Sequence, residues 1–178
     1  MDDSTIKTEC STNYAEPAMA FLLLRGWLAL RAIQTGIEKF SALRTIQKPL
    51  IDPVTGMEDP SGALVEVKVK FYALANYSGI PASLKDKFAA EPLLPKFAMS
   101  LFDKCLGPAL ILTGLMLLVG LGTRISLFAQ GLIYIALTFG LILIKQDDGV
   151  AWLGIHVALI ALALLLVKHN RLAILKKW

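Results

Sequence analysis

The segment from residue 17 to residue 40 reads PAMAFLLLRGWLALRAIQTGIEKF, and it decides how the rest of the chain is interpreted. It is long and apolar enough to cross a bilayer, because an α-helix rises about 1.5 Å per residue and the hydrocarbon core is roughly 30 Å thick. Ionisable groups inside a span are costly and almost never face lipid. The polar positions of this segment are therefore the first candidates for function: Arg25, Arg31, Gln34, Glu38 and Lys39.

The composition of the whole chain supports a membrane protein. Of its 178 residues, 56% are hydrophobic, whereas an average soluble domain is about 45–50% apolar. Three further stretches, at about 101–120, 125–144 and 150–167, are also long and apolar enough to be spans. The sequence therefore predicts an all-α integral membrane protein with a single membrane domain, in which a long extracytoplasmic insertion, about 41–100, follows the first helix of a four-transmembrane-helix bundle.

The charges outside the spans predict the orientation. The N-terminal segment is acidic, which is the wrong sign for a signal peptide, so we expect the first span to remain in the mature protein. The C-terminal tail is basic and carries Lys168, Arg171, Lys176 and Lys177. Because cytoplasmic segments carry an excess of Lys and Arg, we expect both termini in the cytoplasm and the chain in the cytoplasmic (inner) membrane of a prokaryote.

The insertion has its own pattern. Residues 49–62 are rich in Pro, Asp and Gly and predict irregular loop. Residues 64–70 alternate apolar and charged side chains, which fits either a half-buried strand or a short amphipathic helix. Residues 84–90 and 93–100 are typical of short interfacial helices. A loop longer than about 15 residues is usually functional, so we expect the insertion to cap the outer mouth of the bundle or to dock a partner.

The polar residues of the first span follow a helical period. Trp27, Arg31, Gln34 and Glu38 fall in one narrow stripe of a helical wheel. A second stripe nearby consists of Arg25, Gly36 and Lys39, and we expect both stripes to face the other helices. A quinone head group needs donors at its carbonyl oxygens, a proton-exchanging group and an apolar slot. Ion pairing that only holds the helices together is the alternative. The groups expected near the outer leaflet are Glu38, Lys39, Asp103, Lys104, Lys145, Asp147, Asp148, Trp152 and His156.

Metal and nucleic-acid chemistry find no support in the sequence. Cys10 and Cys105 form neither a CxxC pair nor a metal-type spacing. With only His156 and His169 available, we expect no metal or haem to be bound by this chain alone. No basic and aromatic pattern indicates a nucleic-acid partner.

Short motifs in the spans carry a family resemblance. The first span contains Leu-Arg-Gly-Trp at 24–27 and ends in Gly-Ile-Glu-Lys-Phe at 36–40. The second span runs through a glycine- and leucine-rich stretch into Thr-Arg, at 114–124, and the fourth follows Asp-Gly at 148–149. This pattern resembles the DoxX/DoxD family of four-helix membrane proteins, in which DoxD is the quinone-reactive membrane subunit associated with thiosulfate:quinone oxidoreductase.

The resemblance implies a membrane subunit of a quinone-linked oxidoreductase that passes electrons from a sulfur donor to quinone. Arg31 and Gln34 then donate hydrogen bonds to the quinone, and Glu38 handles protons with a second group. The cofactor is quinone, and the partners are membrane lipid and other subunits of a redox complex. The residues assigned to quinone binding are Trp27, Arg31, Gln34 and Lys39, and those assigned to proton transfer are Glu38, Asp147 and His156.

A second hypothesis is a non-catalytic accessory subunit of a larger membrane respiratory or redox complex. In this hypothesis the chain docks through residues 49–100. A departure from the family pattern favours it, because the family has a carboxylate early in the second span. Residues 105–113 contain none, and Asp103 is the nearest.

Overall fold

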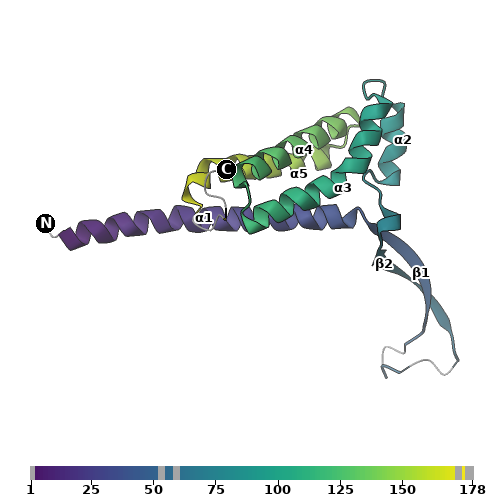
Figure 1. Ribbon diagram of the computed structural model, residues 1–178. Coiled ribbons are helices and arrows are strands. Elements are labelled where there is room, and N and C mark those ends of the chain that lie inside the picture. The colour runs from purple at the N-terminus through teal and green to yellow at the C-terminus, as the bar shows by residue number, and fades with distance from the viewer. Residues whose placement is uncertain (1–2, 52–54, 58–60, 171–173, 175–178) are drawn as a thin grey trace.

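The computed structural model describes residues 3–51, 55–57, 61–170 and 174, and it is mostly helical (Figure 1). A single two-stranded antiparallel sheet accompanies the helices in this part of the chain. The helices are α1 (Asp3–Glu38), α2 (Ala82–Ala90), α3 (Lys96–Val119), α4 (Thr123–Leu143) and α5 (Asp147–Leu166), with short 3-10 helices at Leu74–Asn76 and Val167–His169. The strands are β1 (Ser41–Pro49) and β2 (Leu64–Tyr72).

Within the described residues, three helices are long and apolar enough to cross a membrane. They are α3, α4 and α5, the last taken together with the turn that follows it. These helices contain the predicted spans at 101–120, 125–144 and 150–167 except for residues at their edges. The prediction of a helical protein with membrane-spanning segments is confirmed to that extent, whereas the all-α description was incomplete because it left out the sheet.

Helix α1 packs against α3 and α5 and projects beyond them at its N-terminal end (Figure 1). It begins at Asp3, well before the predicted start of the span, and ends at Glu38. Its contact with α3 depends on small residues, which let two helices approach closely. A Cβ on Gly114 would lie 3.0 Å from the carbonyl oxygen of Ala29, and one on Gly36 would lie 3.0 Å from that of Gly107.

Helices α3 and α4 are joined by a tight turn of two glycines in the left-handed region. Gly120 has φ 83° and Gly122 has φ 53°, conformations that residues with a Cβ rarely adopt. The turn brings α4 back along α3, and α5 then returns along α4. The buried apolar core between these helices is formed by Phe21, Leu28, Ala29, Leu106, Leu110, Leu117, Leu127, Tyr134, Ile160 and Ala163.

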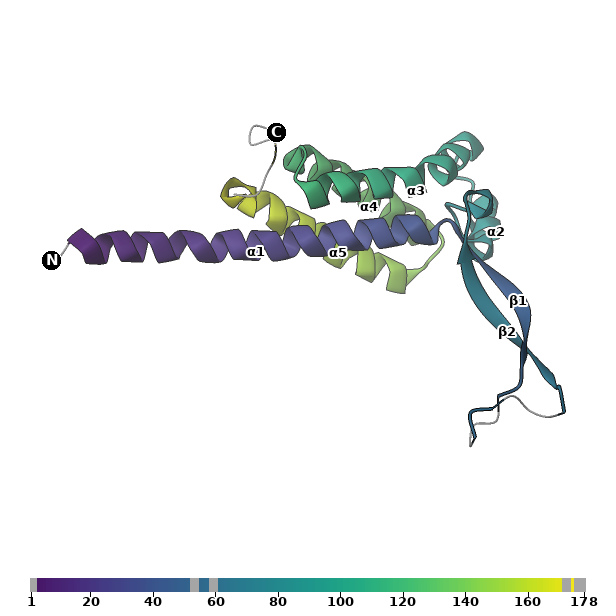
Figure 2. The same cartoon turned by 60° about the horizontal axis from the view of Figure 1, so that its bottom comes forward.

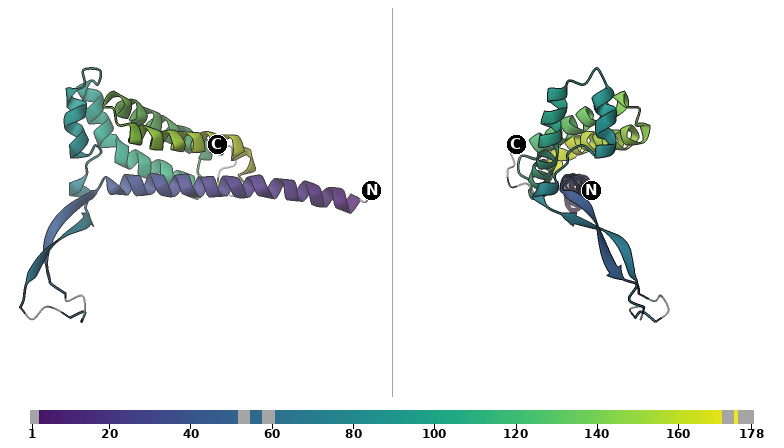
Figure 3. Two further views of the ribbon diagram at one scale, coloured as in Figure 1. Left: turned by 180° about the vertical axis from the view of Figure 1, so that it is seen from behind. Right: turned by 90° about the vertical axis from the view of Figure 1, so that its right-hand side faces the viewer.

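The insertion between α1 and α3 has two parts. Its first part is the β1–β2 hairpin, in which Ser41 pairs with Tyr72 and Pro49 with Leu64. The alternating valines of residues 64–70 therefore form a strand and not a helix, as β-branched residues favour. Strand β1 was not predicted, because its sequence alternates only weakly. The hairpin leaves the bundle at the end of α1 and runs away from it (Figures 2 and 3).

The second part of the insertion turns back onto the bundle. Helix α2 confirms the short helix predicted at 84–90. The predicted separate helix at 93–100 was wrong, because α3 begins directly after Pro95 and residues 96–100 form its first turns. Pro95 takes the N-cap position, where a missing N–H costs nothing.

Candidate functional site

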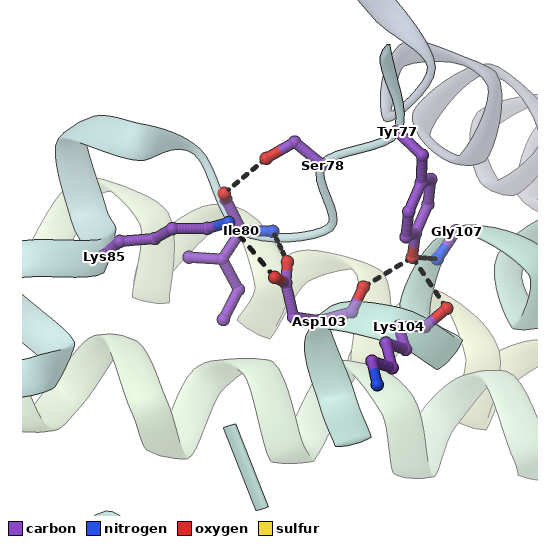
Figure 4. Close-up of polar contacts among 7 residues, drawn as sticks. All are labelled: Tyr77, Ser78, Ile80, Lys85, Asp103, Lys104 and Gly107. Carbon is purple, nitrogen blue, oxygen red and sulfur yellow. Dashed lines mark hydrogen bonds and ion pairs between the residues drawn. The ribbon is translucent and has the colours of Figure 1, made fainter. Parts of the chain in front are cut away.

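A hydrogen-bond cluster attaches the insertion to α3 (Figure 4). Pro108 lies inside α3 and has no N–H, so the carbonyl of Lys104 lacks its usual helical donor. The hydroxyl of Tyr77 lies 3.0 Å from that carbonyl and 2.6 Å from the carbonyl of Asp103. The N–H of Gly107 in turn donates to the Tyr77 hydroxyl at 3.1 Å. The tyrosine thus replaces helix bonds at the proline.

The carboxylate of Asp103 completes this attachment. Its Oδ1 accepts a 2.6 Å bond from the N–H of Ile80, and its Oδ2 lies 3.1 Å from Nζ of Lys85 in α2. Gly79 passes so close that a Cβ there would collide with the carbonyl oxygen of Asp103. Both carboxylate oxygens of Asp103 therefore hold the insertion in place.

Beneath α2 lies a cavity of about 620 Å³. Small-molecule sites typically enclose about 300–1,000 Å³ and are mostly apolar. All five helices contribute to its lining, which includes the ring of Trp152. Two cationic side chains of the α1 region, Arg31 and Lys39, also line it, and no carboxylate does so among the residues that the structure describes. The main apolar wall residues are Leu84, Phe88, Leu94, Phe102, Leu106, Leu137 and Leu153.

Only two of the four residues predicted for quinone binding reach this cavity. Arg31 and Lys39 line it, whereas Trp27 and Gln34 are exposed on the outward side of α1. The Nη1 atom of Arg31 makes a long contact of 3.5 Å with Oε1 of Gln34. The prediction that both polar stripes face the other helices was therefore wrong for Trp27, Gln34 and Glu38 and is confirmed for Arg25 and Gly36, which are buried. The buried face of α1 consists of Phe21, Arg25, Leu28, Ala29, Ala32 and Gly36.

The predicted proton-transfer residues lie in three different places. Glu38 is exposed and accepts a 3.3 Å bond from Nζ of Lys70, and this bond raises the pKa of Lys70. Asp147 lies in the first turn of α5, where a negative charge stabilises the helix N-terminus. Neither lines the cavity. His156 is buried one turn after Trp152, whose carbonyl oxygen is 2.8 Å from Nδ1 of the histidine.

Two buried polar residues near His156 escaped the sequence reasoning. Nε2 of Gln130, which is fully buried, donates to the carbonyl of Leu28 at 3.2 Å and to the hydroxyl of Tyr134 at 3.1 Å. The Tyr134 ring meets His156 edge-on, with the ring centroids 5.6 Å apart. A polar i, i+4 pair in an otherwise apolar span is a signal that could have identified them.

This cluster retains unused hydrogen-bonding capacity. A carbonyl only accepts, so His156 Nδ1 carries the proton and its Nε2 offers a lone pair. Nε2 of His156 and Oε1 of Gln130 are both buried without a hydrogen-bond partner among the described residues. An unsatisfied buried polar group costs about 1–3 kcal/mol, and such groups in native structures call for an explanation, a catalytic role among them. His156 therefore stays a candidate although it does not line the cavity.

The opposite end of the bundle contains a charged residue with complete partners. Arg25 is only 5% exposed. Its Nε donates to the carbonyl of Leu117 at 2.7 Å, and its Nη2 donates to that of Leu118 at 2.8 Å. These carbonyls lie at the C-terminal end of α3, where a cation is favourable. Its Nη1 also donates to Asn170, at 3.1 Å. Arg25 thus joins α1 to the end of α3 and to Asn170.

Comparisons with known proteins give no match: no protein-family model, curated protein or solved structure is significantly similar to this chain. Among the described residues, no group of three or more His, Cys, Asp or Glu side chains is arranged to hold a metal ion. The functional interpretation therefore depends on the cavity and its lining.

Proposed function

We propose that this chain is a membrane subunit of a quinone-linked oxidoreductase, of the kind the DoxX/DoxD resemblance implies, and that the cavity beneath α2 holds the quinone head group. In this proposal α1 also spans the membrane, so that α1, α3, α4 and α5 form a four-helix bundle in a prokaryotic cytoplasmic membrane. The insertion lies on the outer side. The N-terminal end of α1 and the C-terminal end of α5 lie toward the same end of the bundle (Figure 1), as a chain with four spans requires. Of the basic tail, Arg171, Lys176 and Lys177 lie outside the described residues.

One observation carries the proposal: an apolar cavity of suitable size with two cationic donors and no carboxylate among its described lining residues. The apolar walls suit a quinone ring and the start of its tail. Arg31 and Lys39 can each donate a charge-assisted bond to a carbonyl oxygen, and such bonds are about twice as strong as neutral ones. They would also stabilise negative charge that develops on the ring during reduction.

Reduction of a quinone to a quinol consumes two electrons and two protons. In the proposal the electrons come from a sulfur donor at the outer face. Both protons come from water, and we assign their relay to His156, which is buried one turn after Trp152 and whose Nε2 takes up a proton before passing it on. Glu38 is bonded to Lys70, and neither Glu38 nor Asp147 lines the cavity, so the proposal assigns these two residues no step at this site.

Quinone binding tests this proposal directly. The full chain, in nanodiscs of neutral lipid, is titrated with decylubiquinone while the fluorescence of Trp152 is followed in a Trp27→Phe, Trp178→Phe background. We expect saturable quenching. Arg31→Leu should weaken binding roughly 10- to 100-fold, the usual worth of a hydrogen bond to a charged group. Arg124→Leu, which removes an exposed arginine from the first turn of α4, is the matched control and should leave binding unchanged.

A second variant distinguishes quinone bound in the cavity from quinone dissolved in the surrounding lipid. Leu106→Phe places a ring into the cavity wall without adding a second tryptophan and should strongly weaken saturable quenching. Quenching that persists unchanged in both Leu106→Phe and Arg31→Leu would mean that the quinone partitions into the bilayer, which contradicts the proposal. Absence of saturable quenching in the folded parent protein contradicts it as well.

The second candidate, a non-catalytic accessory subunit, is favoured by the outward stripe of α1. Trp27 is 55% exposed, and Arg31, Gln34 and Glu38 are exposed beside it. Polar groups that face lipid are costly, so a partner helix is expected to cover them. A photo-crosslinking residue at Gln34, with Leu23 as the control position, should capture that partner in native membranes. Intact quinone reduction in Arg31→Leu, together with loss of the partner when residues within 49–100 are deleted, would favour this candidate.

A further inference from the structure

The β1–β2 hairpin has little contact with the rest of the described chain. Apart from its base, where Lys70 bonds to Glu38, its strands contact mainly each other. An isolated two-stranded hairpin is only marginally stable in water. Its side chains are largely exposed, and an exposed apolar patch usually marks an interaction site. The large exposed apolar residues of the two strands are Leu43, Ile46, Leu64, Val65, Val67 and Tyr72.

The strand register divides the hairpin into two chemically different faces. Residues paired across an antiparallel ladder point to the same side, and successive residues alternate. One side, here called the valine face, therefore consists of Ala42, Arg44, Ile46 and Lys48 of β1 with Val65, Val67, Val69 and Phe71 of β2. The valine face contains two cations and no acid. The single acidic residue of the two strands, Glu66, lies on the opposite face.

The hairpin lies at the level where the membrane surface is expected. Strand β1 begins at Ser41, three residues after the end of α1. In a view along α1, most of the hairpin extends away from the helix axis, crosswise to it (right panel of Figure 3). Since α1 packs along α3, a helix apolar enough to span a membrane, a hairpin that runs crosswise to α1 runs along the bilayer surface.

We propose that the valine face lies on the surface of an anionic membrane. The valines and Phe71 then enter the headgroup region, and Arg44 and Lys48 bind lipid phosphates. Apolar residues combined with cations, without acids, are the composition of surfaces that lie in a lipid interface. The Arg44 guanidinium stacks 4.1 Å from the centre of the Phe71 ring, which keeps the cation beside the apolar surface. A protein partner fits less well, because Lys is depleted in protein interfaces. This proposal does not depend on quinone binding.

Fluorophores on adjacent residues test which face meets the lipid. In a Cys10→Ser, Cys105→Ser background, Val67→Cys and Lys68→Cys each receive an environment-sensitive label, and these neighbours lie on opposite faces. The full chain is placed in phosphatidylcholine nanodiscs with or without phosphatidylglycerol, with a lipid spin-labelled near the headgroup as quencher. We expect quenching of the label at residue 67 in the anionic discs, little quenching at residue 68, and loss of the difference at high salt, which screens exposed charges.

Charge variants test the anionic part of the proposal. Arg44→Gln with Lys48→Gln removes two positive charges from the valine face, and it should lower the equilibrium constant between the lipid-bound and free states of the hairpin roughly 30-fold, since each basic residue near an anionic surface contributes about fivefold. Lys68→Gln with Lys70→Gln removes the same charge from the opposite face and should have a smaller effect.

Three results would overturn the proposal. The first is equal exposure of both labels to water in the anionic discs. The second is quenching at residue 67 that does not depend on lipid charge or on Arg44 and Lys48. The third is shielding of residue 67 in native membranes but not in nanodiscs, which would identify a protein partner instead.

Discussion

The two ends of the helical bundle use positive charge in opposite ways. At the α3–α4 turn, Arg25 is buried, its guanidinium donates to two carbonyls of α3 and to Asn170, and Asn170 in turn donates to the hydroxyl of Thr123. Toward the α2 end, less than two turns further along the same helix, Arg31 lines a cavity and makes one long contact. A charge in an apolar helix is thus not by itself a sign of function. What distinguishes these two arginines is how fully the chain provides their partners.

The largest effect on stability is expected at Arg25, beside the α3–α4 turn. Arg25→Leu leaves the carbonyls of Leu117 and Leu118 without their side-chain donor in a buried region, and each unsatisfied group costs about 1–3 kcal/mol. We expect a loss of about 4 kcal/mol in the free energy of unfolding, measured by SDS titration of the detergent-solubilised protein. Arg124→Leu is the control, because Arg124 is exposed. A loss below about 1 kcal/mol would show that Arg25 is not a structural residue.

At the α2 end of the bundle, the segment that leads into α2 packs closely against the main chain of α3. A Cβ at Gly79 would collide with the main chain at Asp103, so Gly79→Ala must displace the segment that leads into α2. Forcing extra atoms into a packed region costs about 1–3 kcal/mol, and we expect about 2 kcal/mol here together with faster hydrogen exchange in α2. Gly154→Ala is the matched control, because a Cβ there meets nothing within 4 Å. Unchanged exchange in α2 would contradict the attachment.

Much of the insertion between α1 and α3 could not have been predicted from the sequence. Apolar runs located α3, α4 and α5, since long hydrophobic stretches leave few alternatives to a helix. Strand β1 was missed because it owes its conformation to pairing with β2, across residues that are not adjacent in the chain. The role of Asp103 was missed for the same reason, because its partners Ile80 and Lys85 approach only once the insertion folds back.

The candidate site, too, was predictable from the sequence only in part. Trp27, Arg31, Gln34 and Glu38 do share one stripe of α1, yet Trp27, Gln34 and Glu38 face outward and only Arg31 borders the cavity. Helical periodicity shows which residues share a face but not which face is buried. In α1 the close approach to α3 decided this, because it requires the small side chains of Ala29 and Gly36 at the interface.

A smaller effect is expected from the hydroxyl of Tyr77. Tyr77→Phe removes the group that serves the carbonyl of Lys104 and the N–H of Gly107, so we expect a loss of about 1–2 kcal/mol. Tyr72→Phe is the control, because Tyr72 is exposed on the hairpin. The comparison is measured by SDS titration of both variants. Equal stability of the two would mean that the freed carbonyl at Pro108 obtains a partner without the tyrosine.

The smallest stability effect is expected for Arg31, and it sharpens the contrast with Arg25. Arg31 is exposed and bonds only weakly to Gln34, so Arg31→Leu should change the free energy of unfolding by no more than about 0.5 kcal/mol. Under the proposed function, Arg31 serves a ligand and not the fold, so we expect Arg31→Leu to combine near-neutral stability with lost ligand binding. A loss of stability comparable to that of Arg25→Leu would instead place Arg31 among the structural residues, and Lys39 would then be the one cation among the described cavity residues that is available to a ligand.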